Sequence, residues 1–144
     1  MFAGLLALTV AALFTGAALY VSFVEHPARI QTGAEAAVNE FIPSYKRGAV
    51  MQATLSAVGL LTGIGAWLLG GSWLWLVGAL VLGAPIVVTL LIIFPINKRL
   101  LDSALNRSSG EALRLLIQWG RLHLIRSALG FAALLILLTA MRKG

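Results

Sequence analysis

Long apolar runs, separated by shorter polar segments, make up most of the chain. The runs that have the length of a membrane span cover residues 2–24, 48–69, 73–94 and 122–141. A helix needs about 20 consecutive apolar residues to cross the hydrocarbon core of a bilayer. The pattern therefore predicts an all-α integral membrane protein, in which an antiparallel four-helix bundle forms one domain over residues 1–144.

Two of the connections carry helix signals of their own. The Thr-Gly-Ala-Glu stretch at 32–35 fits a capping box, which predicts a short helix that Pro43 ends. The Ser-Ser-Gly-Glu stretch at 108–111 fits another, and from there the helical pattern is unbroken to the C-terminus. A helix over 109–143 would be about 50 Å long, against about 30 Å for a hydrocarbon core. We therefore expect helices 3 and 4 to extend beyond the bilayer, helix 3 through 97–106.

Composition and charge agree with a membrane protein. Of 144 residues, 60% are hydrophobic and 11% are charged. The net charge of +6 belongs to basic residues that flank the apolar runs, so we expect contact with the lipid bilayer and no nucleic acid. Most of them lie in the two long connections, whereas the opposite face holds only Arg142 and Lys143. The positive-inside rule predicts a multi-pass protein of the cell (inner) membrane, with cytoplasmic long connections and both termini extracytoplasmic.

Polar residues gather at the helix ends that this topology places on the cytoplasmic side. Helical periodicity puts Trp119, His123 and Arg126 on one face where the last apolar run begins. The other helix ends add Glu25, His26, Tyr45, Gln52 and Asn97. An ionisable residue that faces the interior of a membrane bundle is a functional candidate, so we predict that His123 and Arg126 are catalytic. A buried charge needs a partner, so we also expect Glu25 within ion-pair distance of Arg126 or His123.

Two short motifs carry a resemblance to a known family. The Pro-Ile-Asn-Lys-Arg-Leu stretch at 95–100 is followed by Trp119-x-x-x-His123-x-x-Arg126 on the final apolar helix. In these motifs, and in a first helix that ends in a proline-containing segment, the chain resembles the DUF1772 family of small four-helix membrane proteins. That family includes the fungal anthrone oxygenases. The resemblance points to Asn97, Trp119, His123 and Arg126, and it implies anthrone oxidation for the named branch.

One hypothesis is an oxygenase or oxidoreductase that converts a small planar phenol or anthrone-like substrate to a quinone. His123 would take the proton and Arg126 would stabilise the resulting enolate or phenolate. Trp119 would stack on the ring. The expected substrate-binding residues are Trp119, Asn97, Gln52, Tyr45 and Glu25. O2 itself can oxidise such an anion, so this scheme needs no cofactor.

Other hypotheses remain open at this point. His26 and His123 would place two imidazoles near one face, as required for haem b, and Glu25 would complete a metal site with them. A non-enzymatic accessory subunit, as a homo-oligomer or within a larger membrane assembly, would use the small-residue face of the second helix for packing. A transporter is less favoured, because the charged groups lie at one face and not at the bilayer midplane.

Overall fold

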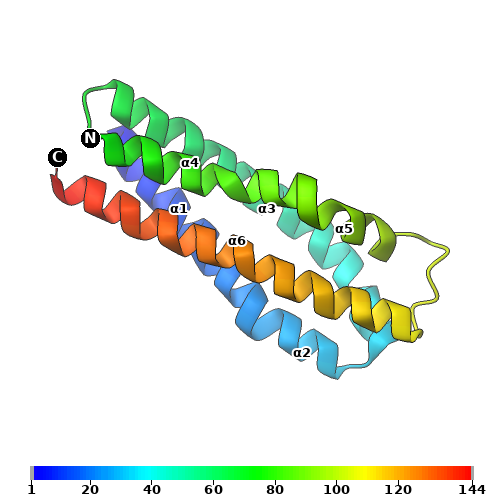
Figure 1. Ribbon diagram of the computed structural model, residues 1–144. Coiled ribbons are helices and arrows are strands. Elements are labelled where there is room, and N and C mark those ends of the chain that lie inside the picture. The colour runs from blue at the N-terminus through cyan, green and yellow to red at the C-terminus, as the bar shows by residue number, and fades with distance from the viewer. Residues whose placement is uncertain (1, 144) are drawn as a thin grey trace.

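The computed structural model describes residues 2–143, and within them the chain is all-helical, without a strand (Figure 1). Continuous helical segments run over Phe2–Gln31, Ala34–Leu68, Trp73–Leu100 and Gly110–Lys143. By length and composition, all four are able to cross a membrane. The predicted all-α membrane bundle of four long helices is confirmed.

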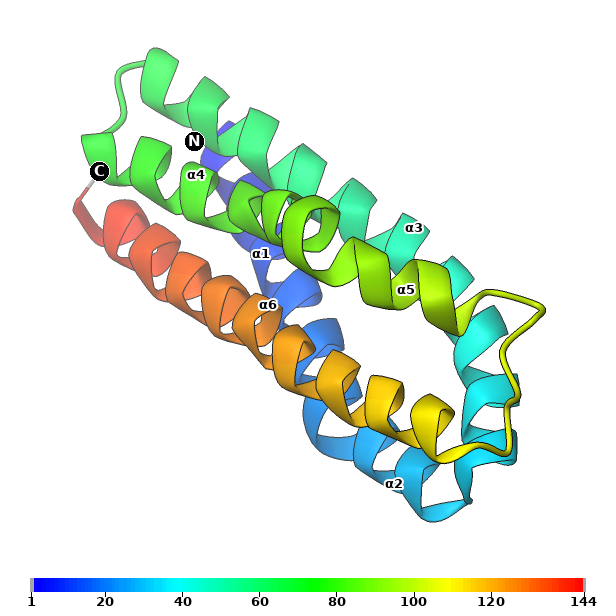
Figure 2. The ribbon, with the colours of Figure 1, turned by 45° about the vertical axis from the view of Figure 1, so that its right-hand side comes forward.

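The four main helices are α1 (Phe2–Tyr20), α3 (Ala34–Leu68), α4 (Trp73–Val88) and α6 (Gly110–Lys143). Each of α1 and α4 packs mainly against α3 and α6, so α1 lies diagonally opposite α4, and α3 lies diagonally opposite α6. The two chain ends lie beside the turn between α3 and α4, while the loop before α6 lies at the far end (Figures 1 and 2). A contact between α3 and α6 therefore crosses the middle of the bundle.

Two of the long helices contain a π-helical turn shortly before a proline. The remaining elements are η1 (Val21–Glu25), α2 (His26–Gln31), η2 (Thr89–Ile93) and α5 (Phe94–Leu100). Pro27 and Pro95 each lack an N–H group, and the ring of a proline clashes with the carbonyl one turn earlier. The wider turn absorbs this distortion: the His26 N–H donates to the Val21 carbonyl, and the same step recurs before Pro95. Both helices thus continue past their prolines.

The predicted short helix that ends at Pro43 is wrong. Helix α3 runs through Pro43 without a break. Pro43 removes the N–H that would bond to the Asn39 carbonyl, and both residues are exposed, so other groups are able to satisfy that carbonyl. One continuous helix consequently carries residues from both sides of Pro43 into the same interior space.

The helix boundaries also differ from the predicted capping boxes. The Thr32 hydroxyl donates to the Arg29 carbonyl at 2.7 Å, and Gly33, with φ of 89°, precedes α3. At α6 the capping oxygen belongs to Ser109, which accepts from the Ala112 N–H at 3.2 Å. The expected unbroken final helix is confirmed, since α6 has 34 residues and is about 50 Å long.

The third long helix ends earlier than predicted. It stops at Leu100 and not at Asn106, and turns connect it to α6. Within these turns the Asp102 carboxylate accepts from the Ala104 N–H at 2.9 Å. This hydrogen bond holds the pKa of Asp102 below its usual value. A short side chain that bonds to the backbone in this way favours a turn over continued helix.

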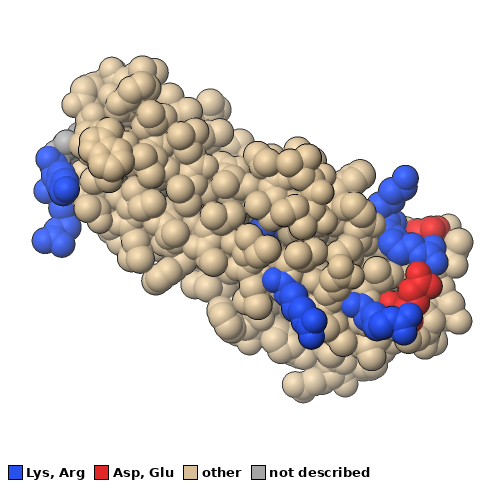
Figure 3. Space-filling model, viewed as in Figure 1, with Lys and Arg blue, Asp and Glu red and all other residues tan. Residues whose placement is uncertain are grey.

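The interior divides into two cores along the bundle. The first, which we call the terminal half, lies near the chain ends and includes Ala7, Ala11, Phe14, Ala18, Trp75, Leu82, Ala133, Leu137 and Ala140. The second, the loop half, includes Ala37, Val38, Phe41, Ile93, Ile96, Leu100, Leu105, Ala112, Leu116 and Trp119. On the face in Figure 3, most Lys and Arg side chains lie toward the two ends, and the broad surface between them is almost entirely uncharged. That surface is suited to contact with lipid.

Candidate functional site

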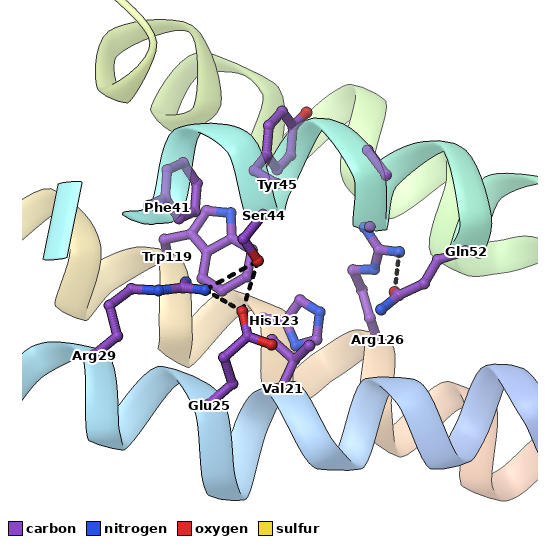
Figure 4. Close-up of a pocket in the computed structure, with 12 residues that line it drawn as sticks. Val21, Glu25, Arg29, Phe41, Ser44, Tyr45, Gln52, Trp119, His123 and Arg126 are labelled. Atoms are coloured by element: carbon purple, nitrogen blue, oxygen red, sulfur yellow. Dashed lines mark hydrogen bonds and ion pairs between the residues drawn. The ribbon is translucent and has the colours of Figure 1, made fainter. Parts of the chain in front are cut away.

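A cavity of about 40 Å³ lies in the loop half, between the first long helix and α3, with α6 as its floor. Its lining includes most of the residues predicted from the sequence: Glu25, Tyr45, Gln52, Trp119, His123 and Arg126 (Figure 4). The volume has room for a few water molecules. We call it the first cavity.

Asn97 lies outside this lining and supports it from behind. Its amide nitrogen donates to the Tyr45 hydroxyl at 3.0 Å, and its amide oxygen accepts from the Trp119 indole nitrogen at 2.8 Å. Asn97 is 1% exposed. Since a buried amide fixes its partners when its polar groups are bonded, Asn97 holds Tyr45 and Trp119 in place on opposite helices.

Arg126 is a buried cation whose partners are neutral. Its terminal nitrogens donate to the Thr89 hydroxyl at 2.8 Å and to the Gln52 amide oxygen at 2.7 Å. Arg126 is 8% exposed, and its Nε has no hydrogen-bond partner. Among residues 2–143, no carboxylate lies within ion-pair distance of Arg126. Burial of an unpaired charge is costly, so the cavity beside this guanidinium favours an anion.

His123 belongs to a chain of hydrogen bonds that determines which ring nitrogen carries its proton. Nδ1 lies 2.9 Å from the Ser22 hydroxyl, which lies 2.8 Å from the Ser127 hydroxyl. The Ser127 hydroxyl donates to the Ala18 carbonyl at 3.0 Å. All three contacts are satisfied together only when Ser22 donates to Ser127 and the Nδ1–H donates to Ser22. The lone pair of His123 is then on Nε2, free to accept a proton.

The predicted ion pair of Glu25 with Arg126 or His123 is wrong. The Glu25 carboxylate bonds instead to the Arg29 guanidinium, and it accepts from the Ser44 hydroxyl at 2.6 Å (Figure 4). The spacing of four residues puts Glu25 and Arg29 on one helix face, where such a pair forms locally. Glu25 nevertheless lines the first cavity.

Arg29 joins the first long helix to α3 beside the cavity. Its guanidinium also bonds to the Glu40 carboxylate and lies 5.4 Å from the centre of the Phe41 ring. The Arg29 side chain is 3% exposed, whereas those of Glu25 and Glu40 are 24% and 49% exposed. This group of charges therefore closes one edge of the cavity from the solvent side.

The two histidines named for a haem or metal site both lie against Trp119. The Trp119 ring packs against both imidazoles, with its centre 5.2 Å from His26 and 4.8 Å from His123. A Cβ on Gly120 would lie 2.4 Å from the His26 Nε2, so that nitrogen is packed against the α6 backbone. Within residues 2–143, no three His, Cys, Asp or Glu side chains are grouped as metal ligands. His26 and His123 thus share Trp119 as a neighbour, and the haem or metal alternative stays a prediction.

Several residues of the site were not among those predicted from the sequence. They are Arg29, Ser44, Thr89 and Ser127. The four-residue spacing of Glu25 and Arg29 was a usable signal for that pair. A Ser or Thr inside an apolar run carries no such signal, because it usually bonds to its own helix.

The chain matches the sequence model of a known protein family. A sequence model of the family described as anthrone oxygenase matches residues 41–136. The matched range contains the site residues on α3, α5 and α6, and it begins after Glu25 and Arg29. No curated protein and no solved structure matches the chain.

Proposed function

This chain belongs to the anthrone oxygenase family, and we propose that it oxidises a planar phenolic or anthrone-like substrate to a quinone without a cofactor. The observation that supports this most is the pairing of a buried, carboxylate-free cation, Arg126, with an imidazole that has a free Nε2, His123. A base beside a cation is what the formation of a carbon acid's anion requires. O2 is the oxidant, and water is the second product.

The reaction begins with a proton transfer. His123 Nε2 takes a proton from the methylene carbon opposite the substrate carbonyl, and the electron pair moves to the carbonyl oxygen as an enolate. Arg126 stabilises that oxygen, because its positive charge is already in place and is excluded from water. The anion then forms a carbon–oxygen bond to O2, and the resulting hydroperoxide loses water. One methylene becomes a carbonyl, whose oxygen is one atom of O2, and the other oxygen atom leaves as water.

The neighbouring side chains bind the ring system. Trp119 lines the first cavity and contacts the edge of the ring that enters it, and Asn97 fixes the indole through its nitrogen. Gln52 positions the Arg126 guanidinium from the opposite helix. Pockets for larger organic ligands usually measure about 300–1,000 Å³. The first cavity, at about 40 Å³, has room for the reacting edge of the substrate only, so the rest of the ring system lies outside it.

We also propose an orientation in the cell (inner) membrane. The long connections, with most of the basic residues, face the cytoplasm, and both termini are extracytoplasmic. The first cavity then lies toward the cytoplasmic side of the bilayer, near the loop half.

The test is a comparison of two matched histidine variants. We expect His123→Gln to lower the rate of anthrone oxidation by about 10²–10⁴-fold, because glutamine bonds but does not accept a proton near neutral pH. O2 consumption and quinone absorbance measure the rate in purified protein. His26→Gln, the same change at a histidine outside the cavity lining, should retain most of the rate. A His123→Gln variant as fast as the parent would contradict the proposal.

Two further outcomes would point to other functions. Equal losses in both histidine variants would favour shared ligation by the two imidazoles. If the parent protein oxidises neither anthrone-like nor quinol-like compounds, a non-enzymatic role as an accessory subunit or binding protein replaces the enzyme.

A further inference from the structure

A second cavity, of about 120 Å³, lies on the other side of Arg126, between α3 and the α4–η2 segment. Ala49, Gln52 and Arg126 line both cavities. The hydrogen bond between Gln52 and Arg126 joins diagonally opposite helices, so these two side chains form the partition between the cavities. A ligand in either cavity therefore meets the same guanidinium.

Among the donor groups of the second cavity, the two hydroxyls are already bonded. The Ser56 hydroxyl donates to the Leu82 carbonyl at 2.5 Å, and the Thr89 hydroxyl donates to the Pro85 carbonyl at 2.7 Å. Both hydroxyl hydrogens are thus occupied. Arg126 retains an unpaired Nε–H in a side chain that is more than nine-tenths buried. The remaining walls are mostly apolar. This combination suits a hydrophobic molecule with one acceptor or anionic oxygen.

The second cavity faces the lipid and not the water. Ala53 on α3 and Leu90 on η2 both line it and are exposed, Leu90 at 61%. Both residues lie inside apolar membrane-length segments, so their exposed faces meet acyl chains in a bilayer. The first cavity, by contrast, is bordered by the charged group around Arg29. An apolar ring that enters between α3 and η2 does not have to remove water from those charges.

We propose that the α3–η2 cavity is the lateral entrance and ring-binding slot of the protein, through which a planar hydrophobic substrate comes from the bilayer and places its oxygen on Arg126. This assignment rests on the proposed function for the identity of the substrate. Ala49 and Ala53 keep the α3 wall free of large side chains, and because about 120 Å³ holds only part of a ring system, the rest remains in contact with lipid. A shift of the Gln52 side chain joins the two cavities and exposes the substrate to His123.

The experiment fills the slot and measures binding separately from turnover. Ala53→Phe places a ring in the second cavity, and its matched control is Val50→Phe, at a position on α3 that is 69% exposed and lines neither cavity. The probe is anthraquinone, the expected product, which binds without reacting. We expect Ala53→Phe in lipid nanodiscs to weaken anthraquinone binding at least tenfold, with Val50→Phe close to the parent.

A second variant and the midpoint of thermal unfolding distinguish a blocked slot from a misfolded protein. Leu90→Trp narrows the slot from η2, and it should weaken binding in the same direction without lowering the midpoint. Unchanged binding in both Ala53→Phe and Leu90→Trp would overturn the entrance, even where His123→Gln has lost turnover. Equal losses in Val50→Phe would overturn it too. If the parent binds anthraquinone through this slot but oxidises no anthrone, the proposed reaction fails and the binding site stands.

Discussion

In the terminal half the helices touch through glycines, whereas in the loop half they touch through buried polar side chains. A Cβ on Gly78 would lie 2.6 Å from Leu137, and one on Gly130 would lie 2.8 Å from Phe14. In the loop half, Gln52 and Arg126 bond across the bundle where apolar contact would otherwise be. Helices that pack closely at a glycine fit together in one arrangement, because a shift produces a clash or a gap. A polar network, by contrast, accepts a new partner by exchanging hydrogen bonds.

The two π-helical turns belong to the polar side of this comparison. Ser22 in η1 bonds to His123, and Thr89 in η2 bonds to Arg126. Each turn thus supplies a hydroxyl to one of the two residues proposed as base and anion stabiliser. π-helical turns are frequent at functional sites. The loop half thus brings together the hydroxyls, the imidazole and the guanidinium of the proposed site, in which Arg126 retains an unpaired Nε.

Arg29→Met tests the role of polar contacts in the loop half, and it should cause the largest loss of stability. This change leaves the Glu25 carboxylate without its guanidinium, so we expect a loss of about 2–4 kcal/mol, reduced from the fully buried case because both carboxylates are partly exposed. Denaturation in detergent measures it. Glu40→Gln, at a carboxylate that is 49% exposed, should cost about 0–1 kcal/mol. If Arg29→Met is as stable as the parent, polar pairs do not hold the loop half together.

Four long helices were predictable because a bilayer requires about 20 apolar residues for each crossing. The ends of the helices were less predictable. Pro43 is a helix breaker by type, yet α3 passes through it, because its surroundings tolerate the lost hydrogen bond. The π-helical turns had no signal beyond the prolines that follow them.

The candidate site was predictable where a single helix determines it. Trp119 and His123 stack at 4.8 Å, as helical periodicity on α6 requires. Partners across helices were not predictable, because they depend on how each helix is rotated about its axis. Arg126 consequently bonds to Gln52 and not to Glu25, although Gln52 and Glu25 both line the first cavity.

A smaller loss of stability should come from a glycine substitution in the terminal half of α3, which a second glycine substitution on the same helix controls. Gly63→Ala places a Cβ 2.7 Å from that of Ala79 and 3.3 Å from the Trp75 carbonyl oxygen, so α3 and α4 must separate. We expect a loss of about 1–3 kcal/mol. Gly65→Ala meets nothing within 4 Å, and it should be neutral or stabilising by up to about 1 kcal/mol. Thermal midpoints that fall equally in both variants would show that glycine contact is not what packs this half.

The smallest effect expected is kinetic, and it concerns Ser22. Ser22→Ala removes the acceptor of the His123 Nδ1–H, so the imidazole also populates the tautomer whose Nε2 carries the proton. A lost hydrogen bond of about 0.5–1.5 kcal/mol corresponds to a decrease of roughly 2–10-fold in kcat for anthrone oxidation. KM should remain constant, because Ser22 does not line the first cavity. Ser22→Thr keeps the hydroxyl and should restore the rate, which a loss of packing alone would not predict. A kcat for Ser22→Ala equal to that of the parent would show that the serine chain does not orient the base.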